Sequence, residues 1–149
     1  MSVMGFKQFK KLFREAASLD IDKSDVKRLS NFVASKLRDL LILGQVNAKI
    51  NGRYIIDYQD IPITGGLQQA IHEFKDMNET LSLSQILEQL ATLPPLKMEL
   101  STLLEKKLPE LVGGITINLA KIFKIINPGI KNPGTEDWNK VEAICQTLL

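Results

Sequence analysis

The sequence predicts an all-α protein in which two similar helical units share one core. Apolar residues recur at spacings of three and four along most of the chain, which is the period of amphipathic helices. Turn-forming clusters divide these stretches into a short, a long and a short helix, and this order occurs twice. Because neither half is large enough to bury its own long helix, we expect one domain over residues 1–149, with halves at about 3–76 and about 80–149.

Composition places the chain among ordinary globular proteins. Its 149 residues are 44% hydrophobic and 24% charged, near the averages of about 45–50% and about 25% for such domains. The single cysteine, Cys145, cannot form an internal disulfide, and the N-terminal segment has no apolar run long enough for a signal peptide or a membrane span. We therefore expect a cytoplasmic protein with no membrane partner.

The first predicted element is a short amphipathic helix over about 3–17. Its apolar positions fall on one side, and they are Phe6, Phe9, Phe13 and Ala17. Four cations at i, i+3, i+4 and i+7 form a second stripe beside them, which consists of Lys7, Lys10, Lys11 and Arg14. No acidic residue interrupts this basic stripe before Glu15. We interpret it as a candidate contact surface for DNA phosphates.

A long helix is predicted over about 24–49. Asp22 or Ser24 can cap its first turn by accepting a hydrogen bond from a backbone N–H. Its apolar positions are Val26, Leu29, Phe32, Val33, Leu37, Leu40, Leu41 and Val46. At about 1.5 Å per residue this helix would be about 39 Å long. Asn51-Gly52 is a strong stop signal, and Tyr54-Ile55-Ile56 favours a short extended run after it.

Three cations flank the predicted start of the long helix, namely Lys23, Lys27 and Arg28. Helix N-termini attract phosphate through their unpaired N–H groups, so these residues are a second set of candidate DNA contacts. Three carboxylates are interleaved with them, namely Asp20, Asp22 and Asp25. Interleaved opposite charges leave little local positive potential.

Four more helices are predicted after the extended run. A third helical stretch starts at Asp57 to Asp60 and continues to Phe74, although Pro62 and Gly65-Gly66 complicate it. The second half has a short helix over about 82–91, a long helical pattern over 96–126 and a last helix over about 135–148. Pro109 should kink or divide the long pattern, since it removes a backbone donor. On the last helix we place Val141, Ile144 and Leu148 on one face.

The residues after the first long helix resemble the second loop of archaeal histones. In that family the loop contains a Gly-Arg pair, and an Asp seven residues after the Arg opens the third helix. Gly52-Arg53 and Asp60 stand at that spacing here. A guanidinium can make two charge-assisted hydrogen bonds to a carboxylate. We therefore expect Arg53 and Asp60 to form a structural clamp, in preference to Arg53 being a free phosphate ligand.

Over residues 6–149 the chain is similar to a small family of bacterial proteins with two histone folds in tandem, so that each chain is its own pseudo-dimer. The similarity rests on short segments: Leu12-Phe13-Arg14-Glu15-Ala16-Ala17, Asn47-Ala48-Lys49, Asn51-Gly52-Arg53, Leu93-Pro94-Pro95, Leu108-Pro109-Glu110-Leu111 and Lys131-Asn132-Pro133. The resemblance implies a histone fold whose long helices cross, and DNA binding by analogy with histones. The second half departs from the pattern, because its second loop lacks Gly-Arg and Trp138 stands in place of the third-helix Asp.

No set of residues points to catalysis or to a metal site. The chain has one histidine, His72, and one cysteine, Cys145, whereas metal sites and Cys-His nucleophile pairs need several such groups close together. We expect a non-enzymatic protein without metal or cofactor, with His72 in an ordinary hydrogen-bonded or half-exposed position and with Trp138 and Cys145 in the core. Gly65-Gly66 and Gly113-Gly114 are interpreted as points of close helix approach or as helix breaks.

Charge leaves two functions open. The net charge is +2 and the pI is 8.6, milder than the pI above about 9 that is typical of nucleic-acid-binding domains. Residues 1–75 hold 12 Lys/Arg and 8 Asp/Glu, whereas residues 76–149 hold 7 and 9. The basic first half favours a histone-like protein that binds duplex DNA without reading bases, which would be associated with the nucleoid. The acidic second half favours an assembly module that pairs with other protein subunits and binds no DNA.

Overall fold

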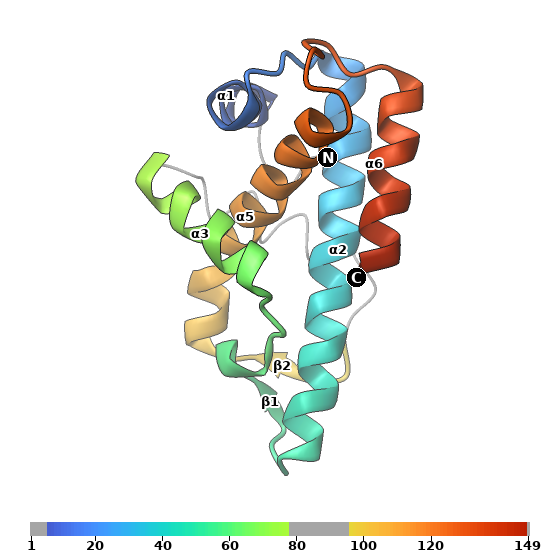
Figure 1. Cartoon of the computed structure of the whole chain (residues 1–149). Helices are drawn as coiled ribbons and strands as arrows, with labels where there is room; N and C mark the ends of the chain where they lie inside the picture. The colour runs from blue at the N-terminus through green and yellow to red at the C-terminus, as the bar shows by residue number, and fades with distance from the viewer. Residues whose placement is uncertain (1–5, 78–95, 149) are drawn as a thin grey trace.

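The computed structural model describes residues 6–77 and 96–148, and it is predominantly helical, as predicted (Figure 1). The helices are α1 (Phe6–Ala17), α2 (Lys23–Ile50), α3 (Gly65–Met77), α5 (Thr102–Ile126) and α6 (Thr135–Leu148). Two short strands, β1 (Ile55–Ile56) and β2 (Glu99–Leu100), and one 3-10 turn at Tyr58–Asp60 complete the described elements. The short helix predicted at 82–91 lies outside the described residues.

Local signals set both ends of α2. Asp22 accepts a hydrogen bond from the Asp25 backbone N–H at 3.0 Å, and the Asp25 carboxylate accepts one from the Asp22 N–H at 3.0 Å. This reciprocal pair satisfies two donors that have no partner within the helix. At the other end, Asn51 closes the helix and Gly52 follows with φ +72°, a conformation that glycine adopts without steric cost. The predicted cap and stop are both confirmed.

The prediction that α5 begins near Leu96 is wrong. Ser101 caps the helix by accepting from the Leu104 N–H, and Glu99–Leu100 is extended as β2. β2 pairs in parallel with β1, with Ile55 opposite Glu99 and Ile56 opposite Leu100. The backbone of this segment is therefore bonded to the first half of the chain instead of to a helical turn of its own.

Two further expectations about helix boundaries also differ from the structure. Pro109 does not divide α5, which is one helix from Thr102 to Ile126, with Leu108 and Leu111 buried on either side; the alternative of a kink stays a prediction. Asp60 does not open α3, because the 3-10 turn ends at an extended Ile61, with φ −75° and ψ 124°. Ile61 precedes Pro62, and a residue before proline is disfavoured in the helical region. The third helix consequently starts at Gly65.

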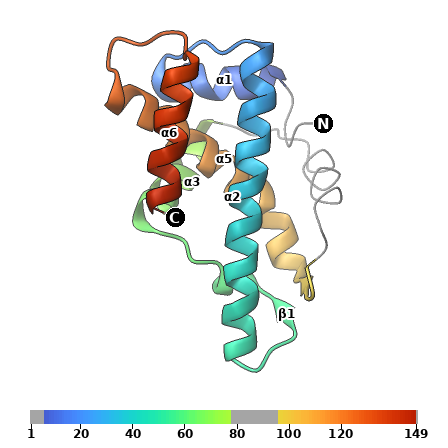
Figure 2. The same ribbon diagram turned by 90° about the vertical axis from the view of Figure 1, so that its right-hand side faces the viewer.

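The short helices pack across the two halves. α1 and α3 of the first half lie mainly against α5 of the second half, and α6 runs beside the N-terminal part of α2 (Figures 1 and 2). Phe13 on α1 meets Phe123 on α5 with ring centroids 6.1 Å apart, and Phe123 meets Trp138 on α6 at 4.8 Å. The hydrophobic core thus draws side chains from both halves.

The connections before and after the long helices also pair across the halves. At one end of the molecule, the Asp20 N–H donates to the Lys131 carbonyl at 2.7 Å. At the other end, the Ser101 N–H donates to the Ile56 carbonyl at 2.8 Å. In each pair, the segment before one long helix is bonded to the segment after the other long helix. The described halves are therefore joined by backbone hydrogen bonds at both ends of the molecule.

Glycines allow α3 and α5 to approach closely. A Cβ added at Gly113 would overlap the Phe74 ring, and one at Gly114 would lie 2.7 Å from Ile71. These positions match the expectation of close helix approach. Gly65 and Gly66 stand at the start of α3, where an added Cβ would meet nothing within 4 Å.

The buried face of α6 differs in part from the predicted one. Trp138, Val141 and Cys145 face the core, as expected for all three, but Leu148 is 74% exposed and Ile144 is also exposed. The face is turned toward α5 by Trp138, whose ring packs edge-on against Phe123. No helix in the described ranges is long and apolar enough to cross a membrane.

Candidate nucleic-acid interface

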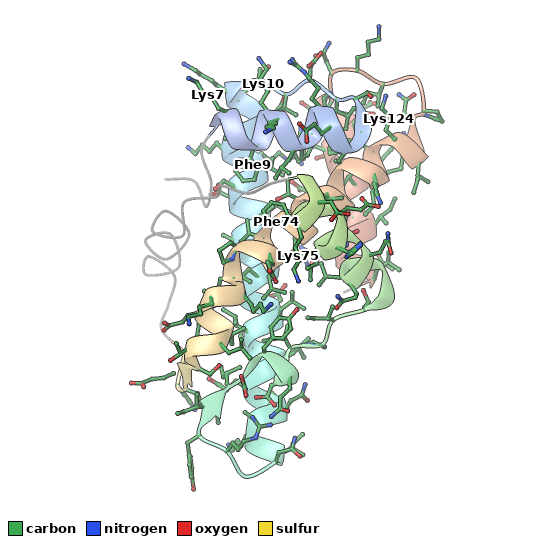
Figure 3. All side chains as sticks on the ribbon, turned by 90° about the vertical axis from the view of Figure 1, so that its left-hand side faces the viewer. Lys7, Phe9, Lys10, Phe74, Lys75 and Lys124 are labelled. Atoms are coloured by element: carbon green, nitrogen blue, oxygen red, sulfur yellow. The ribbon has the colours of Figure 1, made fainter. Side chains whose placement is uncertain are left out.

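The basic stripe of α1 lies on the side of the helix away from the core. Phe9, Leu12 and Phe13 are buried, whereas Lys7, Lys11 and Arg14 are exposed and Lys10 is half-buried. Figure 3 shows Phe9 on the inner side of α1 and Lys7 and Lys10 on its outer side. Of the predicted apolar stripe, Phe9 and Phe13 are buried and Ala17 is half-buried, whereas three of the four predicted cations are exposed. The separation of the two stripes leaves the cations accessible to a large anionic partner.

A loop carboxylate beside α1 is surrounded by cations. Arg14 donates from Nη2 to Asp20 Oδ1 at 2.8 Å and from Nε to the same oxygen at 3.2 Å. The hydrogen bond from Arg14 lowers the pKa of Asp20, and the charges of Arg14, Lys10 and Lys131 lower it further. Both partners of the ion pair are exposed, so it contributes little to stability. Three cations facing one carboxylate leave a local excess of positive charge.

Lys131 is a candidate contact that the sequence analysis missed. It lies far from α1 in the chain, and the Asp20 to Lys131 backbone hydrogen bond brings it to this end of the molecule. The available signal was the turn-rich segment Lys131-Asn132-Pro133, which places an exposed lysine between two helices. Its proximity to α1 depends on tertiary pairing, which periodicity does not report.

The second set of candidates is only partly available. Lys23 and Lys27 are exposed at the start of α2. Arg28 instead holds α2 against α6, because it donates to both carboxylate oxygens of Glu142, at 2.8 and 3.1 Å, and to Asn139 at 2.7 Å. The hydrogen bond to Glu142 raises the pKa of Arg28. Arg28 is therefore a structural contact between α2 and α6, and not the phosphate contact that was predicted.

Two of the carboxylates near α2 have structural partners as well. Asp22 and Asp25 form the capping pair of α2, and Asp25 also accepts a hydrogen bond from Trp138 Nε1 at 3.0 Å. The hydrogen bonds from Ser24 and Asp25 lower the pKa of Asp22. Their negative charges remain at this end of the molecule, so Lys23 and Lys27 add less positive potential than the stripe on α1.

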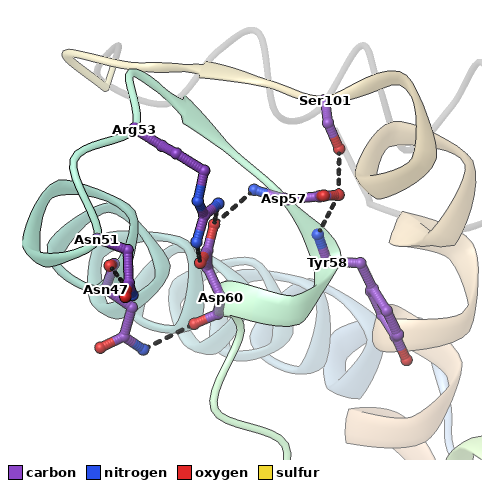
Figure 4. Close-up of polar contacts among 7 residues, drawn as sticks. All are labelled: Asn47, Asn51, Arg53, Asp57, Tyr58, Asp60 and Ser101. Atoms are coloured by element: carbon purple, nitrogen blue, oxygen red, sulfur yellow. Dashed lines mark hydrogen bonds and ion pairs between the residues drawn. The ribbon is translucent and has the colours of Figure 1, made fainter.

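Arg53 and Asp60 are in contact at the opposite end of the bundle (Figure 4). Arg53 Nη1 donates to Asp60 Oδ2 at 2.7 Å, and Nη2 donates to Oδ1. The Asp57 N–H donates to the same carboxylate at 2.8 Å, and Asn47 Nδ2 donates to the Asp60 carbonyl at 2.8 Å. Asp60 is buried, and the bonds from Arg53 lower its pKa. Arg53 is thus held by its neighbours, which leaves its charge compensated.

The Arg53–Asp60 contact is linked to the second half through Asp57. Asp57 Oδ1 accepts from the Tyr58 N–H at 2.8 Å and from Ser101 Oγ at 2.9 Å. Ser101 Oγ in turn accepts from the Leu104 N–H and caps α5. A single chain of hydrogen bonds therefore connects the loop after α2 with the first turn of α5. The Arg53–Asp60 pair was predicted, whereas the continuation from Asp57 to Ser101 was not.

The residues that were considered for other chemistry occupy ordinary positions. His72 is exposed on α3, with Nε2 3.8 Å from Asp76. Cys145 is buried on α6, and desolvation raises the pKa of its thiol. Within residues 6–77 and 96–148, no group of three His, Cys, Asp or Glu side chains could hold a metal ion.

Known proteins provide relatives across the whole length. A family described as a domain of unknown function, DUF1931, matches residues 9–146. A crystal structure of a protein from Thermus thermophilus superposes with a TM-score of 0.95 at 43% identity, covering 99% of each chain. A 1.9 Å crystal structure from Aquifex aeolicus superposes at 0.83 with 25% identity, covering 98% of this chain and 96% of that one.

Two relatives by sequence come from Aquifex aeolicus (strain VF5). One uncharacterised protein is 26% identical over 145 residues, which is 97% of this chain and 84% of the relative. A second uncharacterised protein of that organism is 35% identical over 130 residues, covering 78% of this chain and 75% of the relative. From the extent of the family match, the chain belongs to the DUF1931 family.

Proposed function

We propose that the chain is a histone-like protein that binds duplex DNA through its phosphate backbone without reading bases. In this proposal the two halves are tandem histone-fold units that form an intramolecular pseudo-dimer. The order of short, long and short helices in the first half, the packing of short helices on the opposite long helix among the described residues, and the paired connections at both ends support it. A DNA-bound chain would be associated with the nucleoid.

The accessible basic stripe on α1 is the observation that carries the proposal. Lys7 and Lys11 are exposed, and Lys10 and Lys131 contribute positive charge around Asp20. Neutralised phosphates release condensed counterions, and this release supplies nearly all of the free energy of sequence-independent binding. No groove-reading element is needed for such contacts.

The proposed DNA contact is one-sided. At the end of the molecule that holds β1 and β2, Arg53 is bonded to Asp60, and Asp57 places a second carboxylate nearby. At the end that holds α1, Arg14, Lys10 and Lys131 lie around Asp20, and the carboxylates of Asp22 and Asp25 are bonded within the cap of α2. The affinity for DNA should therefore depend on α1 much more than on the loop that carries Arg53.

Salt-dependent titration of one triple variant tests the proposal. Lys7, Lys10 and Lys11 are changed to Gln, while Arg14 is kept because its loss would leave Asp20 without its closest ion-pair partner. Each lost phosphate contact lowers the slope of log K against log salt by about 0.9, so the triple variant should flatten that slope by about 2.7. Binding to a random-sequence duplex of about 60 bp is measured between about 50 and 200 mM salt.

The matched control removes the same charge elsewhere. Lys97, Lys106 and Lys140 are exposed and lie outside α1, so changing these three to Gln gives the same net charge as the test variant. The control should keep most of the wild-type slope. Equal slopes for the test variant and the wild type would remove α1 from the interface, and no binding of the wild type at the lower salt would reject DNA binding.

Exposed aliphatic side chains favour the alternative, a protein assembly module. Four of them lie on the C-terminal half of α2, namely Ile42, Leu43, Val46 and Ile50. Contiguous exposed apolar residues mark protein interaction surfaces. If the wild type fails to bind DNA, the double change Val46→Glu and Ile50→Glu should abolish pairing with a purified partner subunit, while the triple change on α1 should leave that pairing intact.

A further inference from the structure

An apolar groove of about 460 Å³ lies between α2, α5, α6 and the segment leading into α3. Phe32 and Leu40 line its α2 side, Leu119 and Ile122 its α5 side, and Cys145 its α6 side. Ile125 and Leu148 stand at the groove and are among the most exposed aliphatic residues of the described chain. The volume falls within the range of about 300–1,000 Å³ that is usual for small-molecule sites.

A buried lysine interrupts this apolar lining. Phe32, Lys36 and Leu40 follow one another at a spacing of four, so they share one face of α2. The side chain of Lys36 is 3% exposed, and its Nζ lies 5.5 Å from the centroid of the Phe32 ring. An aliphatic residue at this position would complete the stripe. The α2 side of the groove therefore contains one buried charged side chain between two apolar ones.

Lys36 is paired with one carboxylate that is exposed to water and with one neutral amide. Nζ donates to the neutral Gln146 Oε1 at 2.9 Å, and it contacts the carboxylate of Asp39 at 3.4 Å, a side chain that is 54% exposed to water. The other strongly buried charge in the described residues, Asp60, receives two hydrogen bonds from a guanidinium. A buried charge is costly unless it is closely paired, so a second anion near Lys36 would be stabilised.

We propose that this groove binds an amphipathic carboxylate, with the aliphatic tail along Phe32, Leu119 and Ile122 and the carboxylate at Lys36 Nζ. Lys121 also lines the groove, and its charge is paired with Glu73 at 2.5 Å, so Lys36 is the cation on which the proposal rests. Cys145 is buried at the α6 side, where its thiol can contact the tail as a small apolar group. The proposal does not depend on DNA binding.

Calorimetric titration of the full chain with decanoate, below its micelle concentration, tests the proposal. Decanoate should bind once per chain. Decyltrimethylammonium has the same tail with the opposite charge, so it should bind at least about tenfold more weakly, the size of one lost charge contact. Equal affinity for the two amphiphiles would show binding to apolar surface alone and would overturn the assignment of Lys36.

Lys36→Met separates the charge from the shape of the groove. Methionine keeps an unbranched side chain, and replacing a buried charge by an apolar group is often neutral or stabilising, so the variant should fold. Its affinity for decanoate should fall about tenfold, whereas its affinity for decanol should be unchanged. Lys106→Met is the matched control, since Lys106 is exposed on α5 and does not line the groove; this variant should bind decanoate as the wild type does.

Reaction of Cys145 with a thiol reagent locates the binding event. Cys145 is the single cysteine and lines the groove, so saturating decanoate should slow its modification. Modification at an unchanged rate with decanoate bound would place the ligand elsewhere. If decanoate does not bind, and the modification slows only as protein concentration rises, the groove is covered by a second copy of the chain and the ligand proposal is rejected.

Discussion

At the scale of single residues, the Arg53–Asp60 contact holds the loop after α2 in place and compensates the charge of the buried carboxylate. Arg53→Ala leaves a buried carboxylate without its guanidinium partner, so the free energy of unfolding should fall more than for Lys49→Ala, a change of an exposed neighbour. Arg53→Lys should fall between the two, because an ammonium cannot make the paired contact. Thermal unfolding ranks the three variants, and DNA affinity should change less than stability; equal stability of Arg53→Ala and Lys49→Ala would contradict the clamp.

The loss of unfolding free energy in Arg53→Ala should depend on pH, because it depends on the ionised carboxylate of Asp60. The pKa of Asp60 is lowered in the folded state by its hydrogen bonds from Arg53. A carboxyl group whose pKa is lower in the folded than in the unfolded protein stabilises the fold at pH values above its pKa in the unfolded chain, which is about 3.9. This stabilisation is lost as the pH falls through the pKa of the folded protein. The difference in unfolding free energy between wild type and Arg53→Ala should therefore be constant from neutral pH to about pH 5 and shrink below about pH 4.

Sequence reasoning located the residue contacts that are local and missed those that cross the halves. The contact of Arg53 with Asp60 was predicted from the resemblance of this loop to that of archaeal histones, and both residues lie within one short segment. Arg28 was interpreted as a phosphate contact from its place near the start of α2, and the contact with Glu142 was not predicted because Glu142 lies in the other half of the chain. Lys131 was overlooked for the same reason, since the Asp20 to Lys131 backbone bond alone brings it beside α1.

At the scale of elements, the crossing of α3 over α5 depends on a missing side chain. Gly113→Ala would place a Cβ against the Phe74 ring, inside contact distance. Such overpacking costs about 1–3 kcal/mol, and Phe74→Leu in the same chain should recover part of that loss. Gly66→Ala is the control on α3, where nothing lies within 4 Å, and it should leave stability unchanged or raise it by up to about 1 kcal/mol. Denaturant unfolding measures all four proteins, and a neutral Gly113→Ala would show that α3 can shift away from α5.

Helix boundaries were predictable where a cap or a stop lies within a few residues. The start of α2 at the Asp22–Asp25 capping pair and its end at Asn51-Gly52 belong to this class. The start of α5 does not, because the segment before it pairs with β1 in the other half. Ser101 then caps the helix, so a pattern that is helical in sequence from Leu96 is not helical before the cap, and the last two residues before the cap form β2.

At the scale of the whole molecule, the packing across halves makes each half dependent on the other. α1 and α3 cover α5 of the other half, and Arg28 and Lys36 of α2 are bonded to Glu142 and Gln146 of α6. A fragment of residues 1–79 would expose the apolar faces of α1, α2 and α3 together, since the helix that fills the space among them is absent. The periodicity of the sequence predicted a shared core, but it did not specify which short helix covers which long helix.

Truncation after Glu79 tests this dependence. The fragment should not fold as a monomer: it should either lose most of its helical signal and aggregate, or form a homodimer in which a second copy of α2 takes the place of α5. Circular dichroism and sedimentation at several concentrations distinguish these states, and mixing with the separately expressed second half should restore a 1:1 complex. A monomeric fragment that is helical and unfolds cooperatively would contradict the shared core, because α1 and α3 would then have found enough apolar surface on α2 alone.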